Sequence, residues 1–195
     1  PHTRMTPLRS FSGLAAVLLV VACLPSARAT LIHRYSFTDG AKDGAGSVDG
    51  RLLGAGATIT GGELVLKNER SAYGDKVACL EFAGPVLPAG GTSASLAVWF
   101  TAKSIGGFAR VLNFGDSEGT EGKQFLYFTP CTEEGLARVA ITATDATAKT
   151  YIDFDALDDG QSHLVVVVVD GATQSLRVFV DGKEPRPAQP LGDNT

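Results

Sequence analysis

The sequence contains little of the material from which catalytic and metal sites are most often built. Among 195 residues there are three histidines, three cysteines and one tryptophan. Phosphate-binding loops and Cys-x-x-Cys pairs are absent, so neither motif class indicates a site. The run that begins at Asp153 is not an EF-hand loop, because glycine is missing from its sixth position. Three histidines, one of them in a segment expected to be removed, also leave little choice for a catalytic triad.

Long apolar runs and basic clusters are missing as well. No window of 18 or more apolar residues exists, so an ordinary transmembrane span is not expected. The formal net charge is −4, and the sequence contains no run of basic residues. A negative field repels phosphate backbones, so nucleic acid is not an expected partner. An apolar content of 44% with 19% charged residues instead indicates a folded chain.

Residues 1–29 have the pattern of a targeting segment. Arg4 and Arg9 precede an apolar stretch at 11–24, and residues 25–29 end in a small-x-small cleavage box. Met5 is the only methionine, so residues 1–4 are interpreted as upstream sequence. Cleavage after Ala29 leaves 14 basic against 21 acidic residues in the mature chain, a net charge of −7.

Lipoprotein processing is the alternative at this end of the chain. Residues 20–23, Val-Val-Ala-Cys, resemble a bacterial lipobox, which would place a lipid on Cys23 and the domain on a membrane surface. Strand-like sequence begins almost directly after Ala29, without the polar tether typical of lipoproteins. The prediction is therefore a secreted or cell-surface protein made by way of a signal peptide.

The strongest structural signal lies at residues 161–183. Residues 164–169 are one leucine and five valines, which predicts a strand buried on both faces. Turn residues follow at 170–174, and 175–180 alternates as a returning strand. This predicts a central β-hairpin in which Val166 or Val167 points between two sheets.

Strand patterns recur every 8 to 20 residues elsewhere, and helical periodicity is absent. Glycine-rich turns separate these patterns, and the chain has 23 glycines. The sequence therefore predicts an all-β fold, a two-sheet antiparallel β-sandwich that forms one domain over residues 30–195. The further expected strands are 31–37, 51–53, 57–60, 63–67, 78–82, 95–101, 110–114, 124–129, 138–144 and 150–154.

Two cysteines remain after removal of the targeting segment. An exported chain could pair Cys79 with Cys131, and closing a loop of about 50 residues would stabilise the fold by roughly 4 kcal/mol. Alternatively the two are separate thiols, Cys79 in a strand and Cys131 in a loop. The sequence leaves both possibilities open.

Six segments carry a resemblance to a known family: 33–37, 43–50, 95–100, 111–116, 162–166 and 176–182. Their order and spacing over residues 31–183 resemble the bacterial LamG-like jelly-roll domain of the concanavalin A-like lectin/glucanase superfamily. The resemblance implies two stacked antiparallel sheets and a non-catalytic binding or adhesion module that recognises a glycan or an extracellular protein. It also implies a final strand beside 31–37, and residues 190–195 do not supply it, so a truncated record with an unpaired edge is expected.

Calcium is the one cofactor that the resemblance brings into consideration. Asp43 and Asp49 lie in the glycine-rich loop 38–50 that looks like the family's metal-binding region, with Asp39 nearby. Such loops offer carboxylates beside carbonyls, which suits a hard cation. The alternative is that each aspartate stabilises a turn.

The glucanases of this superfamily suggest the only catalytic hypothesis, a degenerate or weak glycoside hydrolase. Asp153, Asp155 and Asp158 have the spacing of their Glu-x-Asp-x-x-Glu motif, but both glutamates are replaced by the shorter aspartate. The alternative is a solvated strand face that ends in the turn 158–160. The expectation is therefore a protein that is not an enzyme.

Aromatic residues are the remaining candidates for a glycan site. Trp99 could be a sugar platform, but the resemblance places it inside the sandwich, which favours core packing. Phe108, Tyr127 and Tyr151 are equally eligible platforms, and the sequence does not choose among them. Both mature histidines, His33 and His163, are expected to be structural. A purely structural spacer in a larger surface protein remains the third functional alternative.

Overall fold

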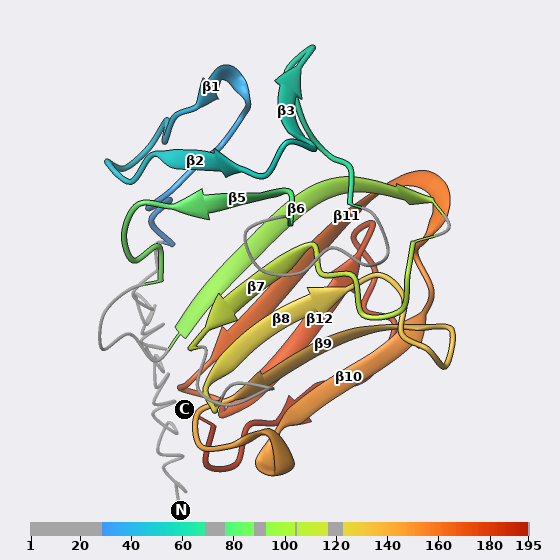
Figure 1. The fold of residues 1–195 in the computed structure, drawn as a ribbon. Helices are drawn as coiled ribbons and strands as arrows, with labels where there is room; N and C mark the ends of the chain where they lie inside the picture. Colours follow the sequence, from blue (N-terminus) through green and yellow to red (C-terminus); the bar gives the residue numbers. More distant parts are fainter. Residues whose placement is uncertain (1–28, 69–76, 88–92, 104, 117–122, 195) are drawn as a thin grey trace, which may run out of the picture. The chain divides into compact units, whose positions relative to one another are not determined.

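Two four-stranded antiparallel sheets contain most of the strand residues that the structure describes (Figure 1). The computed structural model describes residues 29–68, 77–87, 93–103, 105–116 and 123–194. The strands described below all lie in one compact unit of the chain, Ile32–Thr195. The first sheet has the order β13-β12-β11-β6, formed by Gln189–Pro190, Ser175–Val180, Asp159–Asp170 and Ser93–Lys103. The second has the order β10-β9-β8-β7, formed by Thr150–Asp155, Leu136–Thr142, Phe125–Thr129 and Leu112–Gly115.

The valine-rich hairpin is the centre of the first sheet, as predicted. β11 pairs with β12 on one side and with β6 on the other, so that Val167 lies between Val178 and Leu96. Val165 and Val167 are buried, whereas Val166 and Val168 on the opposite face are only partly buried. Of the two residues expected to point between the sheets, Val167 does so. Val166 lies on the outer face, because side chains alternate along a strand.

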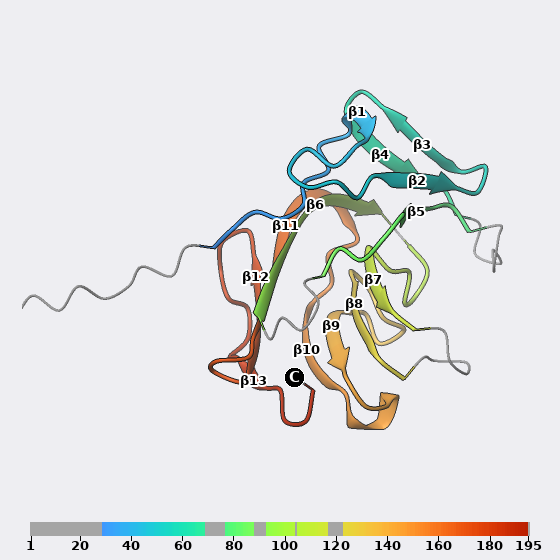
Figure 2. The same ribbon diagram turned by 90° about the vertical axis from the view of Figure 1, so that its left-hand side faces the viewer.

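The second sheet contributes the other half of the core. One hydrophobic cluster combines Phe128, Val139 and Phe154 of this sheet with Val167 and Val178 of the first. The two sheets therefore pack face to face, and the predicted all-β antiparallel sandwich is confirmed. Its jelly-roll connectivity remains a prediction. Figure 2 shows the strands of both sheets after a quarter turn about the vertical axis.

The chain before β6 forms short strands. β2 (Gly50–Leu53) pairs with β5 (Cys79–Phe82), and β3 (Ala57–Thr60) pairs with β4 (Glu63–Leu66). β1 is Thr38–Ala41, and a 3-10 turn, η2, covers Ala146–Ala148. No transmembrane helix occurs among the described residues.

The strand predicted at 31–37 does not form, and β1 lies in the segment predicted as a loop. The side chains alternate as expected, with His33, Tyr35 and Phe37 less exposed than their neighbours. The backbone of Arg34, however, bonds to the following loop, because its N–H donates to the Asp43 carboxylate and its carbonyl accepts from Gly44. Phe37 then takes a left-handed conformation with φ of 59°, which ends the extended run. The unpaired edge expected along 31–37 is therefore not a strand edge.

The two cysteines are separate thiols. Cys79 begins β5 and Cys131 follows β8, and both are free and partly buried. The alternative of a disulfide between them is therefore not realised. Burial raises the pKa of Cys131, and the neighbouring Asp158 carboxylate raises it further. Its thiol is thereby held in the protonated, less reactive form.

Candidate functional site

The outer face of the β10-β9-β8-β7 sheet combines charged and aromatic side chains. Ile152 and Phe154 of β10 point into the core, so Tyr151 and Asp153 must point outward. The strand register places Asp153 opposite Arg138 and Tyr151 opposite Ala140. On the next strand, Tyr127 lies opposite Ala140 and therefore on the same face. Residues far apart in sequence are thus gathered on three adjacent strands.

A bidentate ion pair lies in the middle of this face. The guanidinium of Arg138 donates from Nε to Asp153 Oδ1 over 2.6 Å and from Nη2 to Oδ2 over 2.8 Å. The two side chains are only 15% and 23% exposed. The hydrogen bond to Asp153 raises the pKa of Arg138 despite the opposing effect of burial. Two parallel bonds fix the plane of the guanidinium, so that its faces remain available to aromatic rings.

Three aromatic rings surround the two arginines of this face. The guanidinium carbon of Arg138 lies 4.7 Å from the ring centre of Tyr151 and 5.9 Å from that of Phe108. Arg110 lies 4.3 Å above the ring of Tyr127. Burial raises the pKa of Tyr127, although both arginines act in the opposite direction. The six residues Phe108, Arg110, Tyr127, Arg138, Tyr151 and Asp153 are called the aromatic–arginine face below.

Access to this face is uneven. Tyr151 is 47% exposed, Arg110 is exposed and Phe108 is half-buried. Tyr127 is almost fully buried and packs against Phe125 and Ala140 in a second small apolar cluster. Tyr151 is therefore the ring most accessible to a ligand, whereas Tyr127 is packed beneath the exposed surface of the face.

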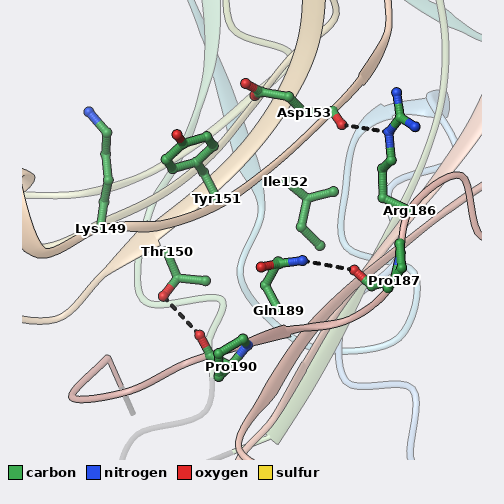
Figure 3. A pocket seen from close by; sticks show the side chains of 9 residues that line it. All are labelled: Lys149, Thr150, Tyr151, Ile152, Asp153, Arg186, Pro187, Gln189 and Pro190. Atoms are coloured by element: carbon green, nitrogen blue, oxygen red, sulfur yellow. Dashed lines mark hydrogen bonds between the residues drawn. The ribbon is translucent and has the colours of Figure 1, made fainter.

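A groove adjoins the aromatic–arginine face along β10 (Figure 3). It has a volume of about 470 Å³ and is lined by residues 149–153 on one side and by the segment 186–190 on the other. Lys149 and the first four residues of β10 line it together, and side chains alternate between the two faces of a strand, so the groove follows the strand edge. Tyr151 and Asp153 belong to both features and join them.

The acidic run of the glycosidase hypothesis does not converge on one point. Both carboxylate oxygens of Asp153 accept hydrogen bonds from Arg138. Asp155 ends β10, exposed and opposite Leu136. Asp158 lies beyond the strand, where it interacts with the Cys131 thiol. Only Asp153 and Asp155 share a strand face, as the sequence predicted.

The loop 38–50 brings together two of the three candidate calcium ligands. The Asp43 carboxylate is fully buried and accepts hydrogen bonds from the backbone N–H groups of Arg34, Ala45, Gly46 and Val48 and from the His33 ring. Burial raises the pKa of Asp43, but these hydrogen bonds outweigh it, so the pKa lies far below its usual range. Both oxygens of Asp43 are therefore already occupied by donors from the protein.

The other two aspartates have different partners. Asp49 accepts from the N–H of Asp43 over 2.9 Å, and exposed Asp39 pairs with Lys42 Nζ over 2.9 Å. Among the described residues, no group of three or more metal-ligating side chains is found. A β-carbon on Gly46 would lie 2.6 Å from both Asp43 Oδ2 and the carbonyl of Ile32, so this loop requires glycine there. The hydrogen bonds of Asp43 and Asp49 within this loop are those expected if the aspartates stabilise turns, which was the alternative to calcium binding.

Core packing of Trp99 was the wrong expectation. Trp99 is 70% exposed on the outer face of β6, opposite Leu164. Its neighbours Val98 and Phe100 occupy the inner face and pack against the core. Because side chains alternate, those two residues fix the direction of Trp99. The exposed tryptophan and the exposed Tyr151 therefore lie on different sheets.

Both mature histidines bond to carboxylates. His33 contacts Asp43, and His163 Nδ1 lies 2.9 Å from Asp181 Oδ2 while its Nε2 lies 3.3 Å from Asp159 Oδ1. The hydrogen bond with Asp181 raises the pKa of His163, with a further contribution from Asp159. Asp181 also accepts from the N–H of Leu164, so the cluster ties the end of β12 to β11.

Stability should therefore depend on pH through His163. Because its folded pKa is raised, the stabilisation is complete below the unfolded value of about 6.5 and is lost as pH rises through the folded pKa. We expect His163→Gln to lower the melting temperature more at pH 5.5 than at pH 9. An NMR titration that gives His163 a pKa at or below 6.5 would contradict this assignment.

Sequence reasoning missed both arginines of the aromatic–arginine face, Arg110 and above all Arg138. The signal of Arg138 was a single charged residue inside the apolar strand 136–142, which indicates an outward-facing position. Its partner Asp153 is identified only by the strand register.

The sequence also holds a Gly-x-Ser-x-Gly run at 115–119, part of which lies outside the described residues. The strands that flank it, β7 and β8, pair antiparallel, whereas a nucleophile elbow joins a strand to a helix.

None of the protein-family models, curated proteins or solved structures compared with this chain matches it. The chemistry of the aromatic–arginine face and its groove therefore carries the functional assignment.

Proposed function

We propose that this protein is an exported, non-enzymatic binding module that recognises a glycan through its aromatic–arginine face. The observation that carries the proposal is the clustering of Phe108, Tyr127 and Tyr151 around the Arg138–Asp153 pair. Sequence reasoning had named these three rings as eligible sugar platforms without a reason to group them. Two of them lie within 6 Å of the same guanidinium, measured between its carbon and each ring centre.

The chemistry of the face suits a sugar. A pyranose ring has apolar C–H faces and a rim of hydroxyl groups, so it needs both a flat apolar surface and polar partners at its edge. Tyr151 offers an exposed ring, and the hydroxyl of a tyrosine can donate or accept. At the other side of the face, exposed Arg110 lies over Tyr127 and donates to Asn113, and these two side chains supply further polar groups. A few polar groups placed around an apolar floor are typical of a small-ligand site.

Two further features of the chain support an exported module that binds and does not catalyse. The targeting pattern of residues 1–29 supports export, and the resemblance to LamG-like domains supports binding rather than catalysis. Calcium in the loop 38–50 remains a prediction, which the binding proposal does not require. A structural spacer is less favoured, because a spacer has no need of an ordered ion pair beside an exposed aromatic ring such as Tyr151.

A glycoside hydrolase built on Asp153, Asp155 and Asp158 is the less favoured alternative. Retaining hydrolysis needs one carboxylate as nucleophile and a second as acid/base about 5 Å away. Asp153 is already engaged by both donors of a guanidinium, and Asp158 interacts with a cysteine beyond the end of the strand. Neither arrangement offers a free carboxyl group to a glycosidic oxygen.

Comparing the two exposed aromatic residues tests which face binds. Tyr151→Ala removes the accessible ring, and we expect it to weaken glycan binding about tenfold, or about 1.4 kcal/mol, as for a residue that contributes measurably to an interface. Trp99→Ala removes an even more exposed ring from the other sheet, and we expect it to leave affinity within about twofold. Binding is measured by calorimetry with glycans selected on an array.

The opposite pattern decides against the proposed face. If Trp99→Ala abolishes binding and Tyr151→Ala does not, the site lies on the β6 side of the sandwich. If no glycan binds but an extracellular protein does, and Tyr151→Ala removes that interaction, the module recognises a protein surface instead. Both variants change exposed side chains, so folding should be retained and is verified by circular dichroism.

A further inference from the structure

Two cations without carboxylate partners line the groove along β10. Lys149 precedes the strand, and Arg186 lies on the opposite wall, in the segment that leads to β13. The ion pairs between described residues involve other cations, and neither Lys149 nor Arg186 takes part in one. The formal net charge of the chain is −4, so attraction for an acidic ligand comes from these two cations locally and not from the overall field.

Asp153 is the one acidic residue among the described residues that line the groove, and its carboxylate is already neutralised. Asp153 contributes its carbonyl to the groove, where it accepts from Arg186 Nε over 3.3 Å (Figure 3). Its carboxylate binds Arg138 on the sheet face. The bond from Nε fixes the position of the Arg186 side chain and leaves its two terminal amino groups without a described partner. Such a pair of donors matches the two oxygens of a carboxylate.

The spacing of the cations indicates a ligand longer than one sugar. Lys149 and the carbonyl of Asp153 are four residues apart on an extended segment, a separation of about 13 Å. Figure 3 shows Tyr151 and Ile152 between them along the same wall. One small acid cannot contact both ends of such a groove, whereas a linear polymer with repeated carboxylates can. Tyr151 provides the ring on which an intervening sugar would stack.

A peptide strand fits this edge less well. An added β-strand needs the backbone groups of β10 along its length. The segment 186–191 already approaches that edge at both ends, because Arg186 Nε donates to the Asp153 carbonyl and Thr150 Oγ1 donates to the carbonyl of Pro190 over 3.1 Å. Pro187 and Pro190 on the opposite wall have no N–H to offer a strand.

We infer that the groove binds an acidic polysaccharide, one with a carboxylate on successive sugars, through Arg186 and Lys149. This inference rests on the proposed function and adds its ligand class: the aromatic–arginine face holds a sugar ring, and the groove selects a charged chain. Attraction between unlike charges also makes the binding sensitive to salt.

The test compares uronic acid tetramers with their methyl esters, which keep the sugar and remove the charge. Calorimetry with tetramers of galacturonate and of mannuronate should show at least one acid binding about tenfold more tightly than its ester. Arg186→Gln should weaken binding of that acid about tenfold and leave the ester unchanged. Arg186→Lys keeps the charge but loses the two-pronged donor, and should fall between them. Lys103→Ala, at the end of β6, is the charge control and should change nothing.

Four results would overturn the inference. If acid and ester bind equally, or Arg186→Gln leaves the preference intact, the groove does not select charge. The proposed function then still stands as long as Tyr151→Ala weakens binding of the ester. If neither tetramer binds, an acidic polysaccharide of this kind is not the ligand. If poly-L-glutamate binds more tightly than both tetramers and loses that affinity in Arg186→Gln, the groove recognises an acidic peptide.

Discussion

Replacing Val167 with aspartate is expected to unfold the sandwich. Val167 is 1% exposed and lies between Leu96 and Val178 at the centre of the first sheet. The cluster around Val167 consists of apolar side chains, so the new carboxylate would be buried among groups that cannot pair with it. That costs several kcal/mol, which is comparable with the whole stability of a domain, about 5–15 kcal/mol. Circular dichroism and one-dimensional NMR should show loss of cooperative melting and of signal dispersion.

The neighbouring residue provides a matched control. Val166→Asp introduces the same group one position earlier on the same strand, where the side chain faces outward and is partly buried. We expect this variant to fold, with a lower melting temperature. Equal damage from the two substitutions would show that both faces of β11 are covered and that the strand is buried on both sides.

Replacing Asp43 with alanine is expected to have the second largest effect, because one buried carboxylate organises a whole loop. The substitution removes the acceptor of four backbone N–H groups and of His33 at once. We expect the melting temperature to fall by on the order of 10 °C and hydrogen exchange to accelerate across residues 32–50. Because the folded pKa of Asp43 is lowered, its contribution is present above about pH 4 and is lost as pH falls towards the folded pKa.

Asp49→Ala is the control for this prediction. Asp49 lies in the same loop and accepts one backbone hydrogen bond, from Asp43, so its loss should cost much less. Calcium titration of the two variants separates a turn-stabilising role from a ligand role. If calcium raises the melting temperature of the native protein and either substitution abolishes that rise without lowering the metal-free value, these aspartates act as metal ligands.

The fold class could be predicted because its signal is local. Alternation with a period of two, β-branched residues and glycine-rich turns identify strands without knowledge of their partners, as in the valine-rich hairpin. The segment 31–37 shows the limit of that signal. It alternates like a strand, but its backbone bonds to the Asp43 loop, and alternation alone does not reveal which partner a backbone finds.

Trp99 and Arg138 show the same limit at the level of sites. The direction of Trp99 was implied by Val98 and Phe100, but family resemblance was given more weight than alternation along the strand. Arg138 and Asp153 are 15 positions apart, and only the pairing of β9 with β10 places them opposite each other. Phe108, Tyr127 and Tyr151 could be named from the sequence as aromatic candidates. Their grouping depends on strand order, which no local pattern encodes.

The most direct test of the binding face is chemical-shift mapping with a bound oligosaccharide. The side-chain N–H signal of Arg138 and the ring signals of Tyr151 report on the aromatic–arginine face. The indole N–H of the single tryptophan, Trp99, reports on the other sheet. We expect titration to move the first two and leave the indole signal in place, with the oligosaccharide intact in the same tube. Movement of the indole signal alone, or appearance of hydrolysis products, would contradict a non-enzymatic module that binds through the β10-β9-β8-β7 sheet.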